Sequence, residues 1–348
     1  MVYIKLNGFE MKFICFYTKN SVCAVKPITA EEIANADTEY KKLELFNSIV
    51  FTKECDDFLL KVQRDGQLRF HSKVVELNHS KDEGCLFERS VNWHEKWFRY
   101  LELINAFHLT LYSSVIQFKW GSGFSIDFMG FYDVTRNDAF LDDTLWAGAY
   151  YSNNNSGQNR RIQHRQFQIP FSLREQSIGL DSIILNNAVN EFSKISKNHK
   201  VISLLAEMAK SLAEYKQFNN TASLIFSWFG TEKILLSMWE DLRRSSSFSE
   251  YKSAIDERNK YGEHGVVAFK NYKTVHIING LCVAGGVSVD DCNNLHTIRK
   301  SRNKVAHSEH NKISEHDAEL CLKLFVKLMN GFYNMNISLN FDYTTEAI

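Results

Sequence analysis

The stretch that most constrains the fold is NNTASLIFSWFGTEKILLSMWEDL (219–242), whose apolar side chains would surround a helix on almost every side. Asn219 and the two polar residues after it are candidate N-caps, so we predict a helix over about 221–243. A helix that is hydrophobic all round has to be covered by other helices. Glu232 and Lys233 interrupt the apolar run, which argues against a membrane span of roughly 20 residues. The stretch therefore predicts a helix at the centre of a bundle.

Amphipathic stretches on both sides of this helix predict the rest of the bundle. Residues 201–212 place apolar side chains on one face and polar side chains on the other. Two further helices are predicted at about 248–260 and 266–283, and a last helix begins at a cap formed by Ser314. The residues that this last helix is expected to bury are Leu322, Phe325, Met329 and Phe332. Together these segments predict an all-α bundle of four or five helices over 196–340.

Residues 1–190 follow a different pattern, and we predict an α+β domain there. Short β-branched or aromatic runs that are separated by polar turns indicate strands. Large apolar residues repeated at spacings of three and four predict one long helix over about 92–114. The predicted strands are KFICFYTKN (12–20), SIVFTK (48–53), FLLKVQ (58–63), SKVVEL (72–77) and FKWGSGFSIDFMGFYDV (118–134). The expected fold class is an α+β N-terminal domain followed by an all-α helical bundle.

Composition narrows the class of protein. Lysine plus arginine and aspartate plus glutamate number 41 each, which argues against a purely electrostatic nucleic-acid binder. The N-terminal sequence shows no signal peptide, and no stretch has the length of a membrane span. The seven cysteines are scattered without a CxxC motif, which indicates free thiols in a reducing compartment. We therefore expect a cytoplasmic protein with no membrane partner.

The run IRKSRNKVAHSEH (298–310) carries an arginine on the apolar face of a predicted helix. Leu295, Ile298 and Val305 are spaced to lie on one line of that helix, and Arg302 interrupts the line. A buried charge is very costly unless it is paired. The position of Arg302 therefore requires an explanation.

Two explanations for Arg302 are open at this point. In the first, Arg302 forms a structural ion pair, and Glu232 is its candidate partner because it is a lone acid in the most apolar helix. In the second, the planar guanidinium holds a phosphate, and Glu232 is a candidate catalytic acid. His307 would then move protons near neutral pH. Asn303 is four residues before His307 and would orient its ring.

Arginine and histidine without a metal suit RNA cleavage by the RNA's own 2′-hydroxyl group. One group takes the proton of that hydroxyl, another protonates the leaving oxygen, and a cation stabilises the crowded phosphate. The bare Arg-x4-His spacing is weak, because Arg89 and His94 share it. The spacing at Arg302 differs in its context, which is an amphipathic helix capped by Asp290 or Asp291, with another such helix after it.

Metal chemistry is not expected at this motif. His307 and His310 have a metal-compatible spacing, but no acidic or thiol ligand at helical spacing completes the site. Arg258 and His264 resemble the motif as well, but their spacing is one residue longer and the segment leads into a glycine-bounded turn. The sequence therefore predicts no metal and no cofactor.

The run LHTIRKSRNKVAHSE (295–309) resembles the signature of the HEPN superfamily, R-x4–6-H with a polar residue, often Asn, after the arginine. The matching positions here are Arg302, Asn303 and His307, and the predicted helices over about 200–335 resemble a HEPN bundle. An α+β domain followed by such a bundle is similar to the ApeA-type antiphage proteins of bacteria. In that arrangement, the N-terminal domain would sense a trigger or control substrate access.

The resemblance implies a metal-independent endoribonuclease that acts as a homodimer, with two R-x4–6-H motifs meeting across a two-fold axis. Its products would carry 2′,3′-cyclic phosphate and 5′-hydroxyl ends. Defence and abortive-infection toxins of the family cut tRNA or other host RNA after a phage-derived trigger is sensed. Many HEPN domains with intact motifs instead serve as dimerisation or regulatory binding modules, and this alternative stays open.

Basic residues outside the motif are candidate RNA contacts. Arg299 and Lys304 flank Arg302 on the same predicted helix. The densest basic patch of the chain is NRRIQHRQ, with Arg160, Arg161 and Arg165. These side chains would contact the RNA backbone or belong to a sensor loop. The alternative is a solvated loop.

Overall fold

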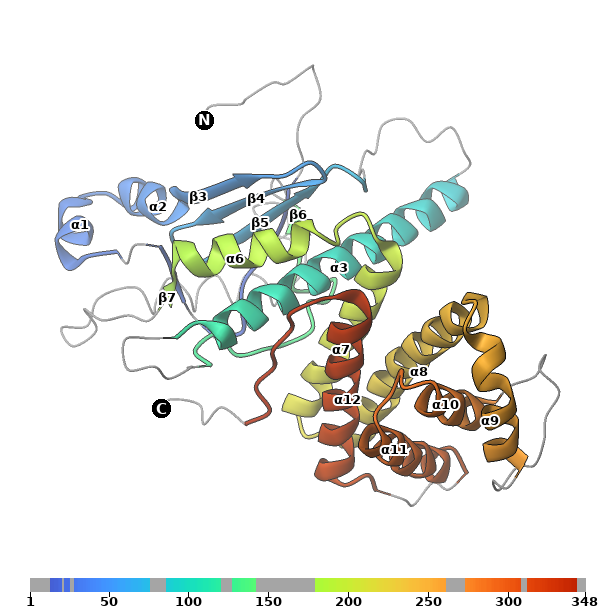
Figure 1. Cartoon of the computed structure of the whole chain (residues 1–348). Helices are drawn as coiled ribbons and strands as arrows, with labels where there is room; N and C mark the ends of the chain where they lie inside the picture. The colour runs from blue at the N-terminus through green and yellow to red at the C-terminus, as the bar shows by residue number, and fades with distance from the viewer. Residues whose placement is uncertain are drawn as a thin grey trace. The chain divides into compact units, whose positions relative to one another are not determined.

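The structure is a computed structural model, and it describes residues 13–20, 22–25, 28–75, 86–119, 127–141, 179–260, 273–307 and 312–342. The chain forms two compact units, shown in Figure 1. The first comprises the chain up to Ala206 and again from Ser338, and the second is Glu207–Ile337. The chain therefore enters the second unit within one helix and returns to the first unit afterwards. The predicted boundary lay earlier, between residues 190 and 196.

The first unit contains a small antiparallel sheet. Its strand order is β3-β4-β5-β1-β6, and each neighbouring pair is antiparallel. The strands are β1 (Ile14–Phe16), β3 (Ile49–Glu54), β4 (Phe58–Gln63), β5 (Leu68–Ser72) and β6 (Phe140–Leu141). A separate parallel pair joins β2 (Cys23–Ala24) to β7 (Gly179–Leu180). β3 and β4 confirm two predicted strands, whereas KFICFYTKN is a strand only at its centre.

Two helices cover one face of this sheet. The helices of the first unit are α1 (Ala30–Asn35), α2 (Glu39–Asn47), α3 (Leu86–Gln117), α6 (Ser182–Ser193) and the first part of α7 (His199–Lys216). α3 confirms the helix predicted over 92–114 and extends it at both ends. α3 and α6 pack together against the sheet (Figure 1). Phe58 and Phe70 stack there with ring centres 5.2 Å apart, and Phe107 meets Phe192 edge to face.

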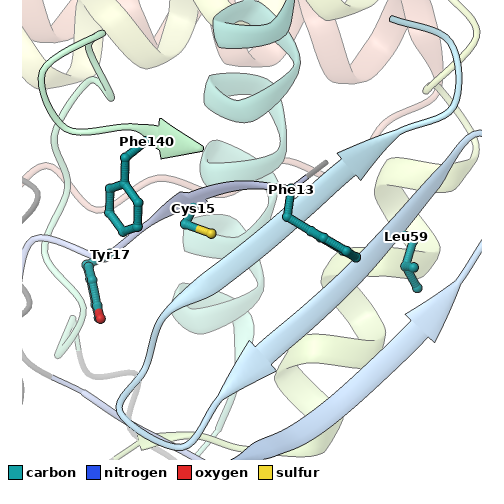
Figure 2. Close-up of a cluster of buried hydrophobic side chains, with 5 residues drawn as sticks. All are labelled: Phe13, Cys15, Tyr17, Leu59 and Phe140. Carbon is teal, nitrogen blue, oxygen red and sulfur yellow. The ribbon is translucent and has the colours of Figure 1, made fainter. Parts of the chain in front are cut away.

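The opposite face of the sheet carries a second apolar cluster (Figure 2). Its members are Phe13, Cys15, Tyr17, Leu59 and Phe140, and all are buried. Side chains alternate along a strand, so the intervening Ile14 and Phe16 lie on the face covered by the helices. Both are also fully buried. Strand β1, which lies between β5 and β6, is thus buried on both faces.

The predicted strand SKVVEL is wrong for residues 73–75, because the strand there, β5, ends at Ser72. The Ser72 hydroxyl accepts hydrogen bonds from the backbone N–H groups of Val74 and Val75, at 3.2 and 3.0 Å. These bonds turn the chain away from the sheet. The real strand, β5, lies before this point, and Tyr100 of α3 fixes its end by accepting from the Ser72 N–H at 2.6 Å.

The predicted strand over 118–134 is also wrong for the residues that the structure describes there. One backbone hydrogen bond, from the Asn20 N–H to the Met129 carbonyl at 3.0 Å, and several side chains hold this segment. Asn105 of α3 donates to the Val134 carbonyl at 2.9 Å and accepts from the Val134 N–H at 2.8 Å. Tyr112 donates to Asp127, whose other oxygen accepts from the backbone of Gly130. The apolar pattern in this segment reflects packing on α3 and not a sheet.

The second unit is helical, so the chain has an α+β N-terminal part followed by a mostly helical remainder. Its helices are the end of α7, α8 (Asn220–Arg244), α9 (Phe248–Lys260), α10 (Thr274–Val283), α11 (Val289–His307) and α12 (Glu315–Tyr333). α8 contacts each of the last four, which confirms its predicted central position. In the described part of the chain, no helix has the length and apolar character needed to cross a membrane.

Small residues on α8 let its neighbours approach closely. Gly230 faces the ring of Phe325 on α12, and a Cβ atom at Gly230 would lie 2.1 Å from that ring. The predicted core residues Leu322, Phe325 and Met329 of α12 are buried, whereas Phe332 is half-buried. The α8–α12 contact therefore forms the core of the second unit.

The helix ends agree with the sequence in some places and differ in others. Asn219 caps α8, as predicted, and Ser314 caps α12 by accepting from the Asp317 N–H at 3.1 Å. The cap of α11 is Ser288 instead of the predicted Asp290 or Asp291, since its hydroxyl accepts from the Asp291 N–H. α10 begins at Thr274, and the earlier part of the predicted helix over 266–283 lies outside the described residues.

Candidate functional site

The candidate site is carried by α11, which packs against α8, α10 and α12. Its first turn is anchored by Asp291, which accepts from Ser288 at 2.6 Å and pairs with Lys327 of α12 at 2.7 Å. Burial acts to raise the pKa of Asp291, but the hydrogen bonds from Lys327 and Ser288 outweigh it and leave the pKa below its ordinary value. The start of the helix is therefore held by a paired charge.

The apolar line of α11 is buried only in its first half. Leu295 and Ile298 are fully buried, whereas Arg302 and Val305 are half-buried. The line therefore leaves the core before it reaches Arg302. This geometry explains how a helix with a core-facing stripe tolerates an arginine at that position, since the side chain keeps contact with solvent.

The guanidinium of Arg302 contacts a neutral group. Its Nη1 donates to Oδ1 of Asn303 at 3.3 Å. Among the residues that the structure describes, no carboxylate pairs with Arg302. Asn303 thus contacts the arginine before it, and its predicted contact with the ring of His307 stays a prediction, because that ring lies outside the described residues. Within the described part of the chain, the other guanidinium N–H groups of Arg302 have no hydrogen-bond acceptor.

Glu232 lies elsewhere in the bundle. It is half-buried on α8 and accepts a hydrogen bond from the hydroxyl of Thr274, the first residue of α10. Within the described part of the chain, no hydrogen bond or ion pair joins Glu232 to Arg302. The structure therefore does not bring the two residues together, either as a structural ion pair or as parts of one site. The contact with Thr274 makes Glu232 a residue that fixes the start of α10.

His307 is the last residue of α11, so the helix continues through the whole Arg-x4-His motif. It is five positions after Arg302, which corresponds to a rotation of about 140° around the helix axis. The side chain of His307 lies outside the described residues. His310 and the patch residues Arg160, Arg161 and Arg165 also lie outside them.

Two further basic residues surround Arg302 on α11. Lys304 is exposed, whereas Arg299 is half-buried and its Nε atom is buried without a hydrogen-bond partner in the described structure. Ser301 donates to Asp317 of α12 at 3.0 Å, which fixes the rotation of α11 at this point. The predicted contacts Arg299 and Lys304 are therefore on the same segment as Arg302.

The arginines of the other two Arg–His spacings lie on helices other than α11. His94 is exposed on α3, in the first unit, so its spacing with Arg89 is not part of the bundle. Arg258 of α9 contacts two cysteine thiols, of Cys282 and Cys292. The sequence offered no signal for this cluster, because its members come from three helices. Over the described residues, no three His, Cys, Asp or Glu side chains are grouped to hold a metal ion.

Searches of the chain against protein-family models, curated proteins and solved structures each find no match. The function of the chain is therefore inferred from the geometry of α11 and from the resemblance of its sequence motif.

Proposed function

We propose that this chain is a metal-independent endoribonuclease of the HEPN type, with Arg302, Asn303 and His307 in its site. The observation that carries the proposal is the environment of Arg302. Its guanidinium is half-buried at the edge of the bundle and contacts an amide oxygen, without a carboxylate among the described residues. A guanidinium in such a position matches the oxygens of a phosphate. Glu232, the candidate partner in a structural ion pair, accepts a hydrogen bond from Thr274 and does not pair with Arg302.

Each residue has a defined role in the proposed reaction. Arg302 holds the scissile phosphate and stabilises the charge that gathers on it in the transition state. Asn303 orients the guanidinium through its Oδ1 atom. His307 transfers a proton, either from the attacking 2′-hydroxyl or to the leaving 5′-oxygen. Attack by the 2′-oxygen breaks the P–O5′ bond and leaves a 2′,3′-cyclic phosphate and a 5′-hydroxyl.

The proposed substrate is RNA, with tRNA as the first candidate, and the proposed context is bacterial antiphage defence in the cytoplasm. Arg299 and Lys304 lie on the same helix segment and would contact neighbouring phosphates. The N-terminal α+β unit would sense a phage-derived trigger or control access of the RNA. Glu232 is left out of the chemistry because its contact is with Thr274.

The test is cleavage of tRNA and total RNA by the purified protein, with and without EDTA. We expect cleavage that EDTA does not reduce and that Arg302→Ala and His307→Ala each lower by about 100-fold or more. The fragment ends should be 2′,3′-cyclic phosphate and 5′-hydroxyl. Cleavage at the wild-type rate by both variants, in folded form, would eliminate this site.

A homodimer is part of the proposal, with Arg302 of one subunit completing the site of His307 in the other. Mixing separately purified Arg302→Ala and His307→Ala proteins should then restore activity, because mixed dimers contain one intact site. Random exchange predicts about a quarter of the wild-type rate. Mixing two preparations of the same variant is the control. A mixture as inactive as its components would show that the site is complete within one chain.

The second candidate function is a non-catalytic HEPN dimerisation or regulatory module. The observation that favours it is the charge distribution of α11, which begins with Asp290 and Asp291 and ends with basic residues. This order stabilises a helix through its macrodipole without any ligand. Under this alternative, Arg302→Ala lowers the melting temperature by several degrees or dissociates a dimer, while the wild-type protein cleaves no RNA.

A further inference from the structure

A cluster of two thiols and a guanidinium lies at the hairpin that joins α10 to α11. Nη1 of Arg258 is 3.4 Å from Sγ of Cys282, and Nη2 of the same residue is 3.6 Å from Sγ of Cys292. The two nitrogens belong to one planar group, so both sulfur atoms contact the same guanidinium. Three helices, α9, α10 and α11, each contribute one member.

The local fold of the hairpin brings the thiols together. α10 ends at Val283, and Gly285 follows with a φ of +73°, a conformation that favours glycine. The Gly286 N–H then donates to the Leu281 carbonyl at 2.8 Å, which closes the turn before α11 begins. Cys282 is therefore on the last turn of one helix, and Cys292 is on the first turn of the next.

The two thiols differ in accessibility. Cys292 is fully buried, whereas Cys282 is half-buried and thus partly exposed to solvent. Burial raises the pKa of Cys292 to about 11, the neighbouring Cys282 thiol adds to this, and Arg258 acts in the opposite direction. An accessible thiol beside a buried one is the arrangement of an attacking and a resolving cysteine.

We propose that Cys282 and Cys292 are a modification site, a dithiol that a hydroperoxide oxidises to a disulfide. The sulfur of Cys282 attacks a peroxide oxygen, the O–O bond breaks, and water or an alcohol leaves, which makes a sulfenic acid. The sulfur of Cys292 then attacks the Cys282 sulfur, the S–S bond forms, and the S–O bond breaks. Water leaves with the proton of the Cys292 thiol, so two thiols are oxidised and one peroxide is reduced.

Arg258 is the positioning residue of this site, since it contacts both sulfurs from a third helix. Cys55 provides a contrast. It is also half-buried, but it lies in the turn after β3 in the first unit, and no contact with another thiol is described for it. The same peroxide should therefore modify Cys55 without forming this disulfide. The proposal is independent of the proposed ribonuclease activity.

Trypsin offers a direct readout, because residues 274–299 contain no internal lysine or arginine and hold both cysteines on one peptide. The full-length protein is treated with hydrogen peroxide, blocked with iodoacetamide, digested and examined by mass spectrometry. We expect this peptide to lose two hydrogens and to resist alkylation until dithiothreitol is added. Cys282→Ser should abolish the cross-link, and Cys55→Ser, the matched control, should form it as the wild type does.

The variant Arg258→Ala removes an exposed side chain and should fold. We expect it to form the disulfide several-fold more slowly than the wild type, because the sulfurs lose their common contact. The proposal is overturned if peptide 274–299 stays fully alkylated under conditions that oxidise Cys55. It is also overturned if Cys282 accumulates as sulfinic acid without any cross-link to Cys292.

Discussion

Two arginines, one in each unit, have different surroundings. Arg64 lies in the turn between β4 and β5 of the first unit, and Arg302 lies in the second half of α11 in the second unit. Arg64 is 8% exposed in its side chain, and both of its terminal nitrogens donate to the carboxylate of Glu32, at 3.0 and 2.6 Å. Arg302 is half-buried and donates to an amide oxygen of Asn303. The first arginine has a charged partner inside the chain, and the second has none among the described residues.

Asp65, the residue after Arg64, is also buried with partners for its charged group. Asp65 is fully buried, and it accepts from the hydroxyl of Tyr17 at 3.0 Å and from the backbone of Gln67 at 3.2 Å. Buried polar groups in native proteins are satisfied in this way. A charged side chain that serves the fold is therefore paired within the chain. Arg302 has no such pair among the described residues, and this difference indicates that it serves a function and not the fold.

The largest expected effect is on activity at Arg302. Arg302→Ala should lower RNA cleavage by about 100-fold or more, because a phosphate ligand is lost. It should change the free energy of unfolding by less than about 0.5 kcal/mol, because the substitution leaves no described carboxylate without its partner. Cleavage rates and urea unfolding of the same preparation measure both. A large loss of stability with unchanged cleavage would make Arg302 resemble Arg64.

The converse result is expected at Arg64. Arg64→Ala should lower the free energy of unfolding by about 1–3 kcal/mol, less than for a fully buried pair because Glu32 is partly exposed. Cleavage per folded molecule should be unchanged. Lys42→Ala is the control, since it removes a surface pair with Glu39 at 2.9 Å and should cost less than about 0.5 kcal/mol. Equal effects of the two substitutions in urea unfolding would contradict the pairing argument.

A substitution at Asn303 would give Arg302 a carboxylate partner like that of Arg64. Asn303→Asp places a carboxylate where Arg302 now meets an amide oxygen. The new pair should compete with phosphate for the guanidinium and lower cleavage by about tenfold, with stability unchanged or slightly raised. Asn303→Ala is the control, because it removes the contact without adding a charge. Cleavage that Asn303→Asp leaves at the wild-type rate would show that Arg302 does not hold a phosphate.

The smallest effect concerns pH and the Arg64 pair. The hydrogen bonds from Arg64, followed by that from the Thr29 backbone, lower the pKa of Glu32 to about 2. A lowered carboxylate pKa stabilises the fold above the unfolded pKa and loses that contribution as the pH falls through the folded one. The stability gap between wild type and Arg64→Ala should therefore narrow between about pH 4.5 and pH 2. A gap that does not change in urea titrations over this range would remove Glu32 as the partner.

Sequence patterns correctly predicted the helices and strands that are defined by residues close together in the sequence. The apolar repeat and the Asn219 cap placed α8 within a residue or two of its bounds, and the runs at β3 and β4 were found. The errors came from side chains that act at a distance. Ser72 ends β5 with help from Tyr100, and Asn105 replaces a strand partner for Val134.

The candidate site shows the same division. The line of Leu295, Ile298 and Arg302 was visible in the sequence, because helical spacing alone defines it. The partner of Glu232 was not, since Thr274 is 42 residues away and the choice between Thr274 and Arg302 depends on how α8, α10 and α11 pack. Spacing predicts which residues share a helix face, and only packing decides which of them meet across helices.

The end chemistry of RNA from bacteria that express the protein decides whether Arg302 is kept for a phosphate or for the fold. We predict that fragments with 2′,3′-cyclic phosphate and 5′-hydroxyl ends accumulate with the wild-type chain and disappear with Arg302→Ala, at equal levels of folded protein. Identical RNA ends in both strains would contradict the account.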